Sequence, residues 1–549
     1  MDTPLFSRRI SFFLFSFLGL IYFSGLFVPL MDNDAAHHAN IALRMYLTGD
    51  YLNLIDHNGD YLDKPHFLFW TSALSYHLFG VTSFAYKFPS FLFTLLGLFS
   101  VYGLGKELYN KETGLLAALV TASSCCFVLA NSDVRMDAIL TACVVFSVWQ
   151  LVFFVNYKKT LSIVLASLGL AVGFATKSHV GLITPLVALL FYILYKKAWS
   201  LFLNPKWLLL VFLFFVFISP VLFCYYQQFN LHPEKIIRGK SNINGVEYLL
   251  FKISAERFQG KFGTESDPFF FFHSFLWSFS PWGVLAFLSF FKRFSVFINR
   301  KKEWLTIGVF LFLLIIISFS KYQLPHYLPL VAPWAALFTV DFFLSLKTKP
   351  VAVKTVFYLQ LFVSLVLFVL TVLLLFWLFS EKNLFLLVLF LLFFFLFFYF
   401  VFLNPHSFLQ KSFLVPVCVS IFLYFYLNTS FYPNLLRYQS GKQLVEQVRG
   451  TVNFNEVYFW KNVYSSSFSF YSASLRKEYV SNETKHNNPF WLFFDAKNKT
   501  AVDAAGFVFG RRFSINDYEI TRLKKDFIFP KSRTASLSPV FLYEVLEKK

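Results

Sequence analysis

Charged residues are scarce in this sequence. Only 14% of its 549 residues are Asp, Glu, Lys or Arg, whereas a soluble protein carries about a quarter. Hydrophobic residues make up 57% of the chain, and its 80 Phe exceed what one soluble core needs. A membrane protein tolerates such a composition, because apolar side chains that face the acyl chains of lipid carry no free-energy cost. The shortage of charge excludes an ordinary soluble protein and predicts an integral membrane protein.

The sequence also lacks a cysteine framework, and its first apolar run does not have the pattern of a cleavable signal peptide. The five Cys lie in apolar runs without metal-ligand spacing, which argues against disulfides and against a cysteine zinc site. The apolar run 10–30 is longer than a signal-peptide core of about 7–15 residues, and no small-residue cleavage site follows it. We therefore expect this run to be retained as the first span.

Apolar runs long enough to cross a bilayer recur along the chain. A span needs about 20 mostly apolar residues, and about thirteen runs approach that length. They are 10–30, 86–105, 114–131, 136–156, 161–176, 179–195, 207–225, 273–291, 304–320, 325–345, 355–378, 383–403 and 412–428. The fold prediction is an all-α polytopic membrane domain over residues 1–428 with about 13 transmembrane helices, followed by a tail.

Basic residues predict the orientation of these spans. The net charge of +19 is divided among short clusters between apolar runs, which argues against nucleic acid and indicates membrane lipids as neighbours. With Arg8 and Arg9 in the cytoplasm, every short-loop cluster falls on the cytoplasmic side, as the positive-inside rule requires. The loops 31–85 and 226–272 and the tail 429–549 are then expected to face outward.

The tail 429–549 has the composition of a small α/β domain. Residues 440–448 predict a helix with Ser440 as its N-cap, and about 120 residues can enclose a core of their own. Short β-type runs alternate with charged turns. These predicted strands are 457–460, 468–471, 491–494 and 507–509. We expect a soluble extracytoplasmic α/β domain.

The loop 31–85 gathers polar side chains directly after the first span. The residues after Asp34 have helical potential, and on such a helix Asp34, His37 and His38 share the N-terminal end and one broad face. A helix N-terminus favours an anion such as the Asp34 carboxylate. Asp32 lies two residues away and fits the same acidic cluster. The loop therefore predicts a polar site at the membrane surface.

Four sequence elements carry a resemblance to a known family. The first element is the loop 31–85, which contains Asp34-Ala35, Met45, Gly49-Asp50-Tyr51 and Asp63-Lys64-Pro65-His66-Phe67-Leu68-Phe69-Trp70. The other three elements are Arg135-Met136-Asp137, Thr176-Lys177-Ser178-His179-Val180-Gly181 and residues 318–329. In this order they resemble the lipid-linked-sugar glycosyltransferases of the GT-C class, and among them the bacterial aminoarabinose transferase and protein O-mannosyltransferase superfamily. Two residues depart from the family pattern: Ala35 stands where some members have Glu, and His66 stands where a second Pro is usual. The match covers about residues 30–335, judged from the order of these motifs.

The resemblance implies an inverting membrane glycosyltransferase of the bacterial inner membrane. The donor would be a sugar on a polyprenyl (undecaprenyl) phosphate carrier, and the acceptor a hydroxyl or phosphate group on a lipid A-like glycolipid, a glycan or a protein. The N-terminus would be cytoplasmic and the C-terminal domain periplasmic. Direct displacement needs a base and cations that hold the leaving phosphate. Asp34 is the expected general base, with its pKa raised by partial desolvation, and Asp137 is the second expected catalytic residue.

The other predicted site residues would bind the donor or a metal. The candidates for substrate or phosphate binding are Lys64, Arg135, His37, His38, Lys177, Lys321 and Tyr327. A span-end cap would also explain Asp137, and ordinary hairpin charges would also explain Lys177 and Lys321. A divalent metal, zinc or magnesium, stays open, with His37 and His38 as ligands beside Asp63.

Two other functions fit a chain with many spans. A lipid or glycan transporter or flippase is expected to carry ionisable groups near the bilayer midplane in broken helices. A polysaccharide polymerase or ligase is expected to keep its basic groups in a late outer loop. Here the charges gather at one face, and the acidic-Lys-Pro element directly follows the first span. Both observations favour the glycosyltransferase, although neither identifies the sugar or the acceptor.

Overall fold

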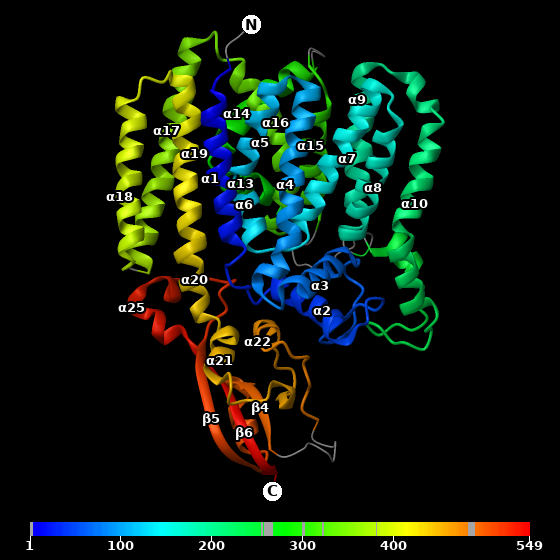
Figure 1. Ribbon diagram of the computed structural model, residues 1–549, viewed down its shortest axis with the longest axis vertical. Coiled ribbons are helices and arrows are strands. Elements are labelled where there is room, and N and C mark those ends of the chain that lie inside the picture. The colour runs from blue at the N-terminus through cyan, green and yellow to red at the C-terminus, as the bar shows by residue number, and fades with distance from the viewer. Residues whose placement is uncertain are drawn as a thin grey trace.

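A helical bundle with a small sheet domain at one end forms the protein (Figure 1). The computed structural model describes residues 4–253, 256, 267–298, 302–320, 323–379, 381–480 and 489–548. The N-terminus lies at the end of the bundle opposite the C-terminal domain. We call the end of the bundle that meets this domain the domain face.

Helices occupy every predicted span. They are α1 (Arg8–Gly25), α4 (Ser83–Leu108), α5 (Lys111–Ala122), α6 (Cys125–Ser132), α7 (Asp137–Tyr157), α8 (Thr160–Lys177), α9 (His179–Lys196), α10 (Lys206–Tyr225), α13 (Phe270–Ser278), α14 (Gly283–Ile298), α15 (Leu305–Ser318), α16 (Ala332–Leu344), α17 (Pro350–Leu373), α18 (Leu384–Phe398) and α19 (Phe408–Tyr426). Within the described residues, 8 helices are long and apolar enough to cross a membrane, or 9 if the bent pair α5 and α6 is one span. The count of about thirteen, which rested on run length, stays a prediction.

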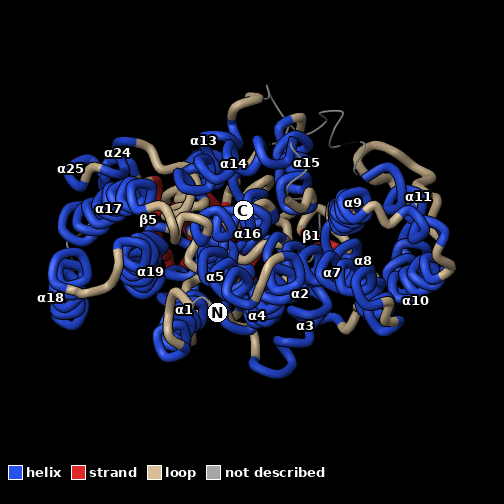
Figure 2. Tube along the Cα trace, turned by 90° about the horizontal axis from the view of Figure 1, so that it is seen from above, coloured by secondary structure: helices blue, strands red, loops and turns tan. Residues whose placement is uncertain are grey.

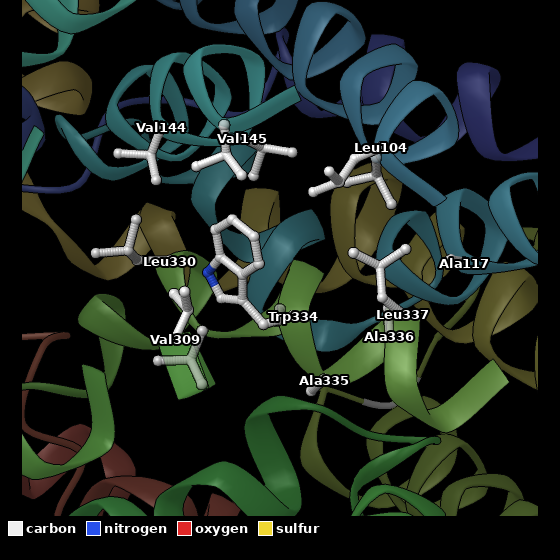
Figure 3. Packing of buried hydrophobic residues seen from close by; sticks show 14 of the residues in the cluster. Leu104, Ala117, Val144, Val145, Val309, Leu330, Trp334, Ala335, Ala336 and Leu337 are labelled. Carbon is white, nitrogen blue, oxygen red and sulfur yellow. The ribbon is translucent and has the colours of Figure 1, made fainter. Parts of the chain in front are cut away.

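Small residues bring the helices of the bundle into close contact. A Cβ on Gly114 of α5 would lie 2.4 Å from a backbone carbonyl oxygen of α4, and one on Gly105 of α4 would lie 2.6 Å from the Cα of Gly114. In lipid, small residues at helix interfaces allow this approach. Trp334 of α16 is fully buried and packs with residues such as Leu104 and Val145 in the middle of the bundle (Figure 3). In Figure 2, α17 to α19 lie at one end of the elongated bundle and α8 to α10 at the other.

The loop 31–85 folds against the domain face. It contains α2 (Asp34–Thr48), the two-stranded hairpin β1 (Ile55–Asp56) and β2 (Gly59–Asp60), and α3 (Phe67–Phe79). The helix predicted after Asp34 is thus confirmed, whereas α3 was not predicted. The described part of the loop 226–272 includes the short helix α11 (Gly245–Glu247).

The C-terminal domain is built on a four-stranded sheet. Its strands are β3 (Val457–Phe459), β4 (Phe490–Asp495), β5 (Phe507–Asp517) and β6 (Ser538–Lys548), in the order β3-β4-β6-β5. Only the β3–β4 pair is parallel. The short helices of this region are α20 (Tyr432–Leu435), α21 (Ser440–Val448), α22 (Ser466–Tyr471), α23 (Lys499–Asp503), α24 (Lys525–Ile528) and α25 (Pro530–Arg533).

Three details of the tail differ from the sequence prediction. The predicted strand 468–471 is wrong, because these residues belong to helix α22, whose first turn is capped by the side chain of Ser465. The N-cap of α21 is Gln439 and not Ser440. The last apolar helical run extends over Phe408–Tyr438, so the boundary placed at residue 428 falls inside it. The sheet domain begins after this run.

Candidate active site

The first turn of α2 presents Asp34 at the domain face. Asn33 is the N-cap, and its side chain accepts a hydrogen bond from the backbone N–H of Ala35. The side-chain amide of Asn33 donates to Asp133 at 3.2 Å, which fixes the start of α2 against the loop before α7. Asp34 is the first helical residue, and its side chain is 51% exposed. The helix N-terminus favours its carboxylate, and solvent or a substrate can reach it.

Arg135 connects Asp34 to two other polar groups. Its Nη1 donates to Oδ2 of Asp34 at 3.1 Å and lies 3.2 Å from Nδ1 of His326, while Nη2 donates to Asp133 at 3.2 Å. Burial lowers the pKa of His326 well below its usual range, so the neutral ring can accept this hydrogen bond. One guanidinium thus joins the start of α2, the loop before α7 and the short helix η4 (Pro325–Leu330).

Asp34 is ionised at neutral pH. Burial raises the pKa of its carboxyl group, but the nearby His38 and Arg135 outweigh burial, and the pKa lies below the ordinary value of 3.8. The expectation that partial desolvation raises this pKa is therefore wrong. The reasons are His38 and Arg135, which favour the ionised form; of the two, Arg135 is in direct contact with the carboxylate.

The tip of the α8–α9 hairpin carries Lys177 into contact with Asp137. Nζ of Lys177 lies 2.6 Å from Oδ1 of Asp137, and the two side chains are only 9% and 5% exposed. The hairpin turns at Ser178, which has a φ of 54°. A Cβ on Gly181 would lie 2.3 Å from the backbone of Gly173, so glycine permits the two helices to meet this closely. Lys177 and Asp137 form a buried ion pair at the domain face of the bundle.

A pocket with a charged end and apolar walls opens beside this ion pair. Lys177 and Asp137 line it together with Asp63 and Lys64, which follow the hairpin β1–β2. Nζ of Lys177 lies 4.3 Å from the ring centroid of Tyr327, another lining residue. The apolar walls come from α7, α9, α15 and η4 and include Leu140, Val180, Leu313, Ile316, Ile317, Leu330 and Val331.

Not all predicted site residues lie at this pocket. His38 is buried beneath α2 within 3.5 Å of the Tyr61 hydroxyl, and burial lowers its pKa to about 3. His37 lines a second pocket between α2 and the C-terminal domain. Asp63 does line the pocket, but it forms an ion pair with Arg238 of the loop 226–272. Asp34 and Arg135 are not among the lining residues. Within the described residues, His37, His38 and Asp63 do not form a cluster with metal-ligand spacing. The predicted Lys321 lies outside the described residues.

Asp32 binds the C-terminal domain instead of facing the pocket. Its carboxylate accepts hydrogen bonds from the hydroxyls of Ser465 and Ser467, at 2.9 Å and 2.8 Å, and from the N–H of Ser466 at 2.9 Å. Its own N–H donates to the side chain of Gln439 at 2.6 Å. Asp32 thus holds α22 against the loop that carries Asp34.

Sequence reasoning missed two residues of this site. Asp133 is a second carboxylate on Arg135, and only its spacing of two residues from Arg135 could have indicated it. His326 was not among the predicted site residues, yet it contacts Arg135 at 3.2 Å. Its place within the element 318–329, next to Tyr327, was the available signal. The missed residues complete a polar cluster around Asp34.

The sequence and the fold are similar to known glycosyltransferases. The profile of the family described as dolichyl-phosphate-mannose-protein mannosyltransferase matches residues 63–223. The undecaprenyl phosphate-alpha-4-amino-4-deoxy-L-arabinose arabinosyl transferase 2 of Proteus mirabilis is 25% identical over 61% of this chain and 60% of its own length. A related arabinosyl transferase of Wigglesworthia glossinidia brevipalpis is 23% identical over 50% of this chain and 48% of its own length. The chain thus spans about half to three fifths of these relatives.

Solved structures share the whole fold. ArnT from Cupriavidus metallidurans bound to undecaprenyl phosphate matches with a TM-score of 0.73 at 13% identity, covering 98% of each chain. The oligosaccharyltransferase of Archaeoglobus fulgidus in its apo form matches with a TM-score of 0.51 at 10% identity, covering 90% of this chain and 71% of its own. These likenesses confirm the resemblance to GT-C lipid-linked-sugar glycosyltransferases, and with it a multi-pass inner-membrane glycosyltransferase.

Proposed function

We propose that the protein transfers a sugar from a polyprenyl phosphate carrier to a hydroxyl or phosphate acceptor at the domain face, with inversion at the anomeric carbon. The pocket lined by Lys64 and Lys177 carries this proposal, and Asp34 lies close enough to Lys64 for that charge to lower its pKa. Its charged end contains Lys64 and Lys177, and its walls are apolar side chains of the bundle. A donor of this class has the same two parts, an anionic phosphate and an apolar chain. The domain face would be the outer side of the membrane.

In the proposed complex the phosphate lies at Lys64 and Lys177. Cations at a leaving phosphate stabilise the charge that develops there. Lys177 is held by Asp137 and by the Tyr327 ring, so its position is fixed before the donor binds. The polyprenyl chain would follow Leu313 and Ile317 of α15 into the membrane. Burial of each CH₂ group of such a chain contributes about 0.8 kcal/mol.

The proposed base is Asp34. The acceptor oxygen forms a bond to the anomeric carbon while the bond from that carbon to the phosphate oxygen breaks, and its electron pair leaves with the phosphate. The acceptor proton passes to the Asp34 carboxylate, which is ionised and half exposed. A phosphate bound at Lys64 would add negative charge near Asp34, on which the charge of Lys64 already acts, and would raise the pKa of Asp34, which brings the base closer to the working pH.

The relatives suggest candidate donors and acceptors that can be tested with this protein. The arabinosyl transferases and the mannosyltransferase family suggest undecaprenyl phosphate carrying 4-amino-4-deoxy-L-arabinose and polyprenyl phosphate mannose as donors. Purified protein in lipid nanodiscs would be given each radiolabelled donor together with lipid A or a protein acceptor. We expect labelled acceptor and free polyprenyl phosphate in equal amounts, and neither with Asp34→Asn.

A control separates this function from lipid transport. In proteoliposomes with donor in both leaflets, a flippase would change the accessibility of the donor without breaking its sugar–phosphate bond. Sugar transfer that depends on Asp34 supports the proposal. Donor movement without bond cleavage, equal in the wild type and in Asp34→Asn, would reject it in favour of transport.

A further inference from the structure

A second polar cluster lies where α2, the hairpin β1–β2 and the C-terminal domain meet. α2 contributes His37, one turn after Asp34, and the hairpin contributes Asp56 and His57 at its turn. The hairpin pairs Asp56 with Gly59, and Gly59 takes a φ of 110°, which favours glycine. The tight turn therefore fixes Asp56 and His57 opposite the helix.

Three possible ligand atoms converge in this cluster. One atom each from His37, Asp56 and His57 lies within 4.8 Å of the others. Oδ2 of Asp56 lies 3.3 Å from Nε2 of His37, and the other oxygen, Oδ1, accepts a hydrogen bond of 2.7 Å from the backbone N–H of Asn58. The carboxylate is thus held with one oxygen turned to His37.

Two imidazole nitrogens of the cluster are buried without an ordinary hydrogen bond. Nδ1 of His57 has no hydrogen-bond partner among the described residues, and Nε2 of His37 has only the Asp56 carboxylate beside it, at 3.3 Å. Buried polar atoms are seldom left in this state, because desolvation without a partner is costly, and an ion is one of the few explanations. Two such nitrogens beside a fixed carboxylate are the ligand set of a transition metal.

The C-terminal domain fixes the orientation of His57. The ring of Tyr464 stacks on the His57 ring at 4.0 Å with an interplanar angle of 7°. Nη1 of Arg476 donates to the backbone carbonyl of His57 at 3.2 Å, and both residues line the pocket that contains the cluster. Outer groups that hold a histidine ring in place are a regular part of protein metal sites.

We propose that His37, Asp56 and His57 bind a zinc ion, with water in the fourth position facing this pocket. Two imidazoles and one carboxylate are ordinary zinc ligands, whereas magnesium prefers oxygen ligands and keeps several waters. The ligands differ from those expected from the sequence, because Asp56 and His57 take the places of His38 and Asp63. The ion would join α2, which carries Asp34, to the hairpin that leads into Lys64.

Metal binding can be tested without any transfer assay. The full chain, with its affinity tag removed, would be purified without chelator, and its zinc content measured by plasma mass spectrometry. We expect stoichiometric zinc and a higher Tm with zinc than after chelation. Cobalt(II) in place of zinc should give the visible absorption bands of a four-coordinate site with nitrogen and oxygen ligands.

Two variants and a matched control identify the ligands. Asp56→Asn and His57→Gln should each lower zinc affinity at least about tenfold and abolish the zinc-dependent rise in Tm. His232→Gln is the control, because His232 is 45% exposed and pairs with Glu234 outside the cluster; it should keep zinc. Variants are compared only as monodisperse preparations. Absence of zinc and of cobalt bands in the wild type, or undiminished zinc in both ligand variants, would overturn the proposal.

Discussion

Replacing Lys177 tests whether its contact with Asp137 is an essential ion pair of the bundle. Both side chains are almost fully buried and their charged atoms are 2.6 Å apart. Removing one partner of a buried pair leaves the other charge without compensation, at a cost of about 3–5 kcal/mol. Lys177→Met keeps an unbranched side chain of similar length but removes the charge, and with it both the ion pair and the contact of the ammonium with the Tyr327 ring.

The double variant Lys177→Met with Asp137→Leu removes both charges. Replacing a buried pair by apolar residues of similar volume is often neutral or stabilising, so stability should return while the single variants stay weak. Transfer should not return, because Lys177 is proposed to hold the donor phosphate. The two readouts therefore separate the structural role of the pair from its role in binding.

The midpoint of thermal unfolding (Tm) in detergent, followed by tryptophan fluorescence, measures the stability of the wild type and of each variant. The predicted order of Tm is wild type and double variant above Lys177→Met and Asp137→Leu alone. A Tm of Lys177→Met equal to that of the wild type would refute the reasoning, because it would mean that the pair contributes nothing. A double variant as unstable as the single variants would refute the charge argument and indicate a packing defect.

Three further predictions concern the charged groups and the orientation. Lys64→Ala should weaken transition-state binding by about 2–4 kcal/mol, as loss of a donor to developing charge does, and unchanged kcat/KM at equal protein level would remove Lys64 from the phosphate site. Activity should fall at acid pH as Asp34 takes up a proton, and the midpoint of this fall in kcat/KM should lie below pH 3.8 in the wild type. In Arg135→Gln the midpoint should rise by about one pH unit, because an adjacent Arg lowers the pKa of Asp by about 1–3 units and Asp34 is half exposed. An unchanged midpoint would mean that Arg135 does not set this pKa. A reporter that is active only in the cytoplasm should give no signal when fused to the C-terminus, and a strong signal would invert the topology.

Local patterns predicted much of the polypeptide. Apolar runs located the helices, and the short motifs named Lys64, Lys177, Asp137 and Tyr327, which the fold brings to one pocket. Each of these signals depends on residues close together in the sequence, so a single sequence contains them.

The failures involve partners that are distant in the sequence. Phe468 and Phe470 alternate with serine as in a strand, yet the segment is helix α22, capped by Ser465 and held at its start by Asp32, more than 430 residues earlier. The pKa of Asp34 was misjudged partly for the same reason, because Arg135, which lowers this pKa together with His38, lies 101 residues away in the sequence. Such contacts appear only once the chain is folded.

Separate replacement of Asp34 and Asp32 tests the central claim most directly. Asn keeps the size and the hydrogen bonding of Asp but cannot take the acceptor proton. With labelled polyprenyl phosphate donor and equal amounts of folded protein, Asp34→Asn should lower the rate of transfer by about 100- to 10,000-fold. Asp32→Asn should keep most of the transfer, because Asp32 contacts the C-terminal domain. Near-normal turnover by Asp34→Asn, with Asp32→Asn inactive, would contradict the account.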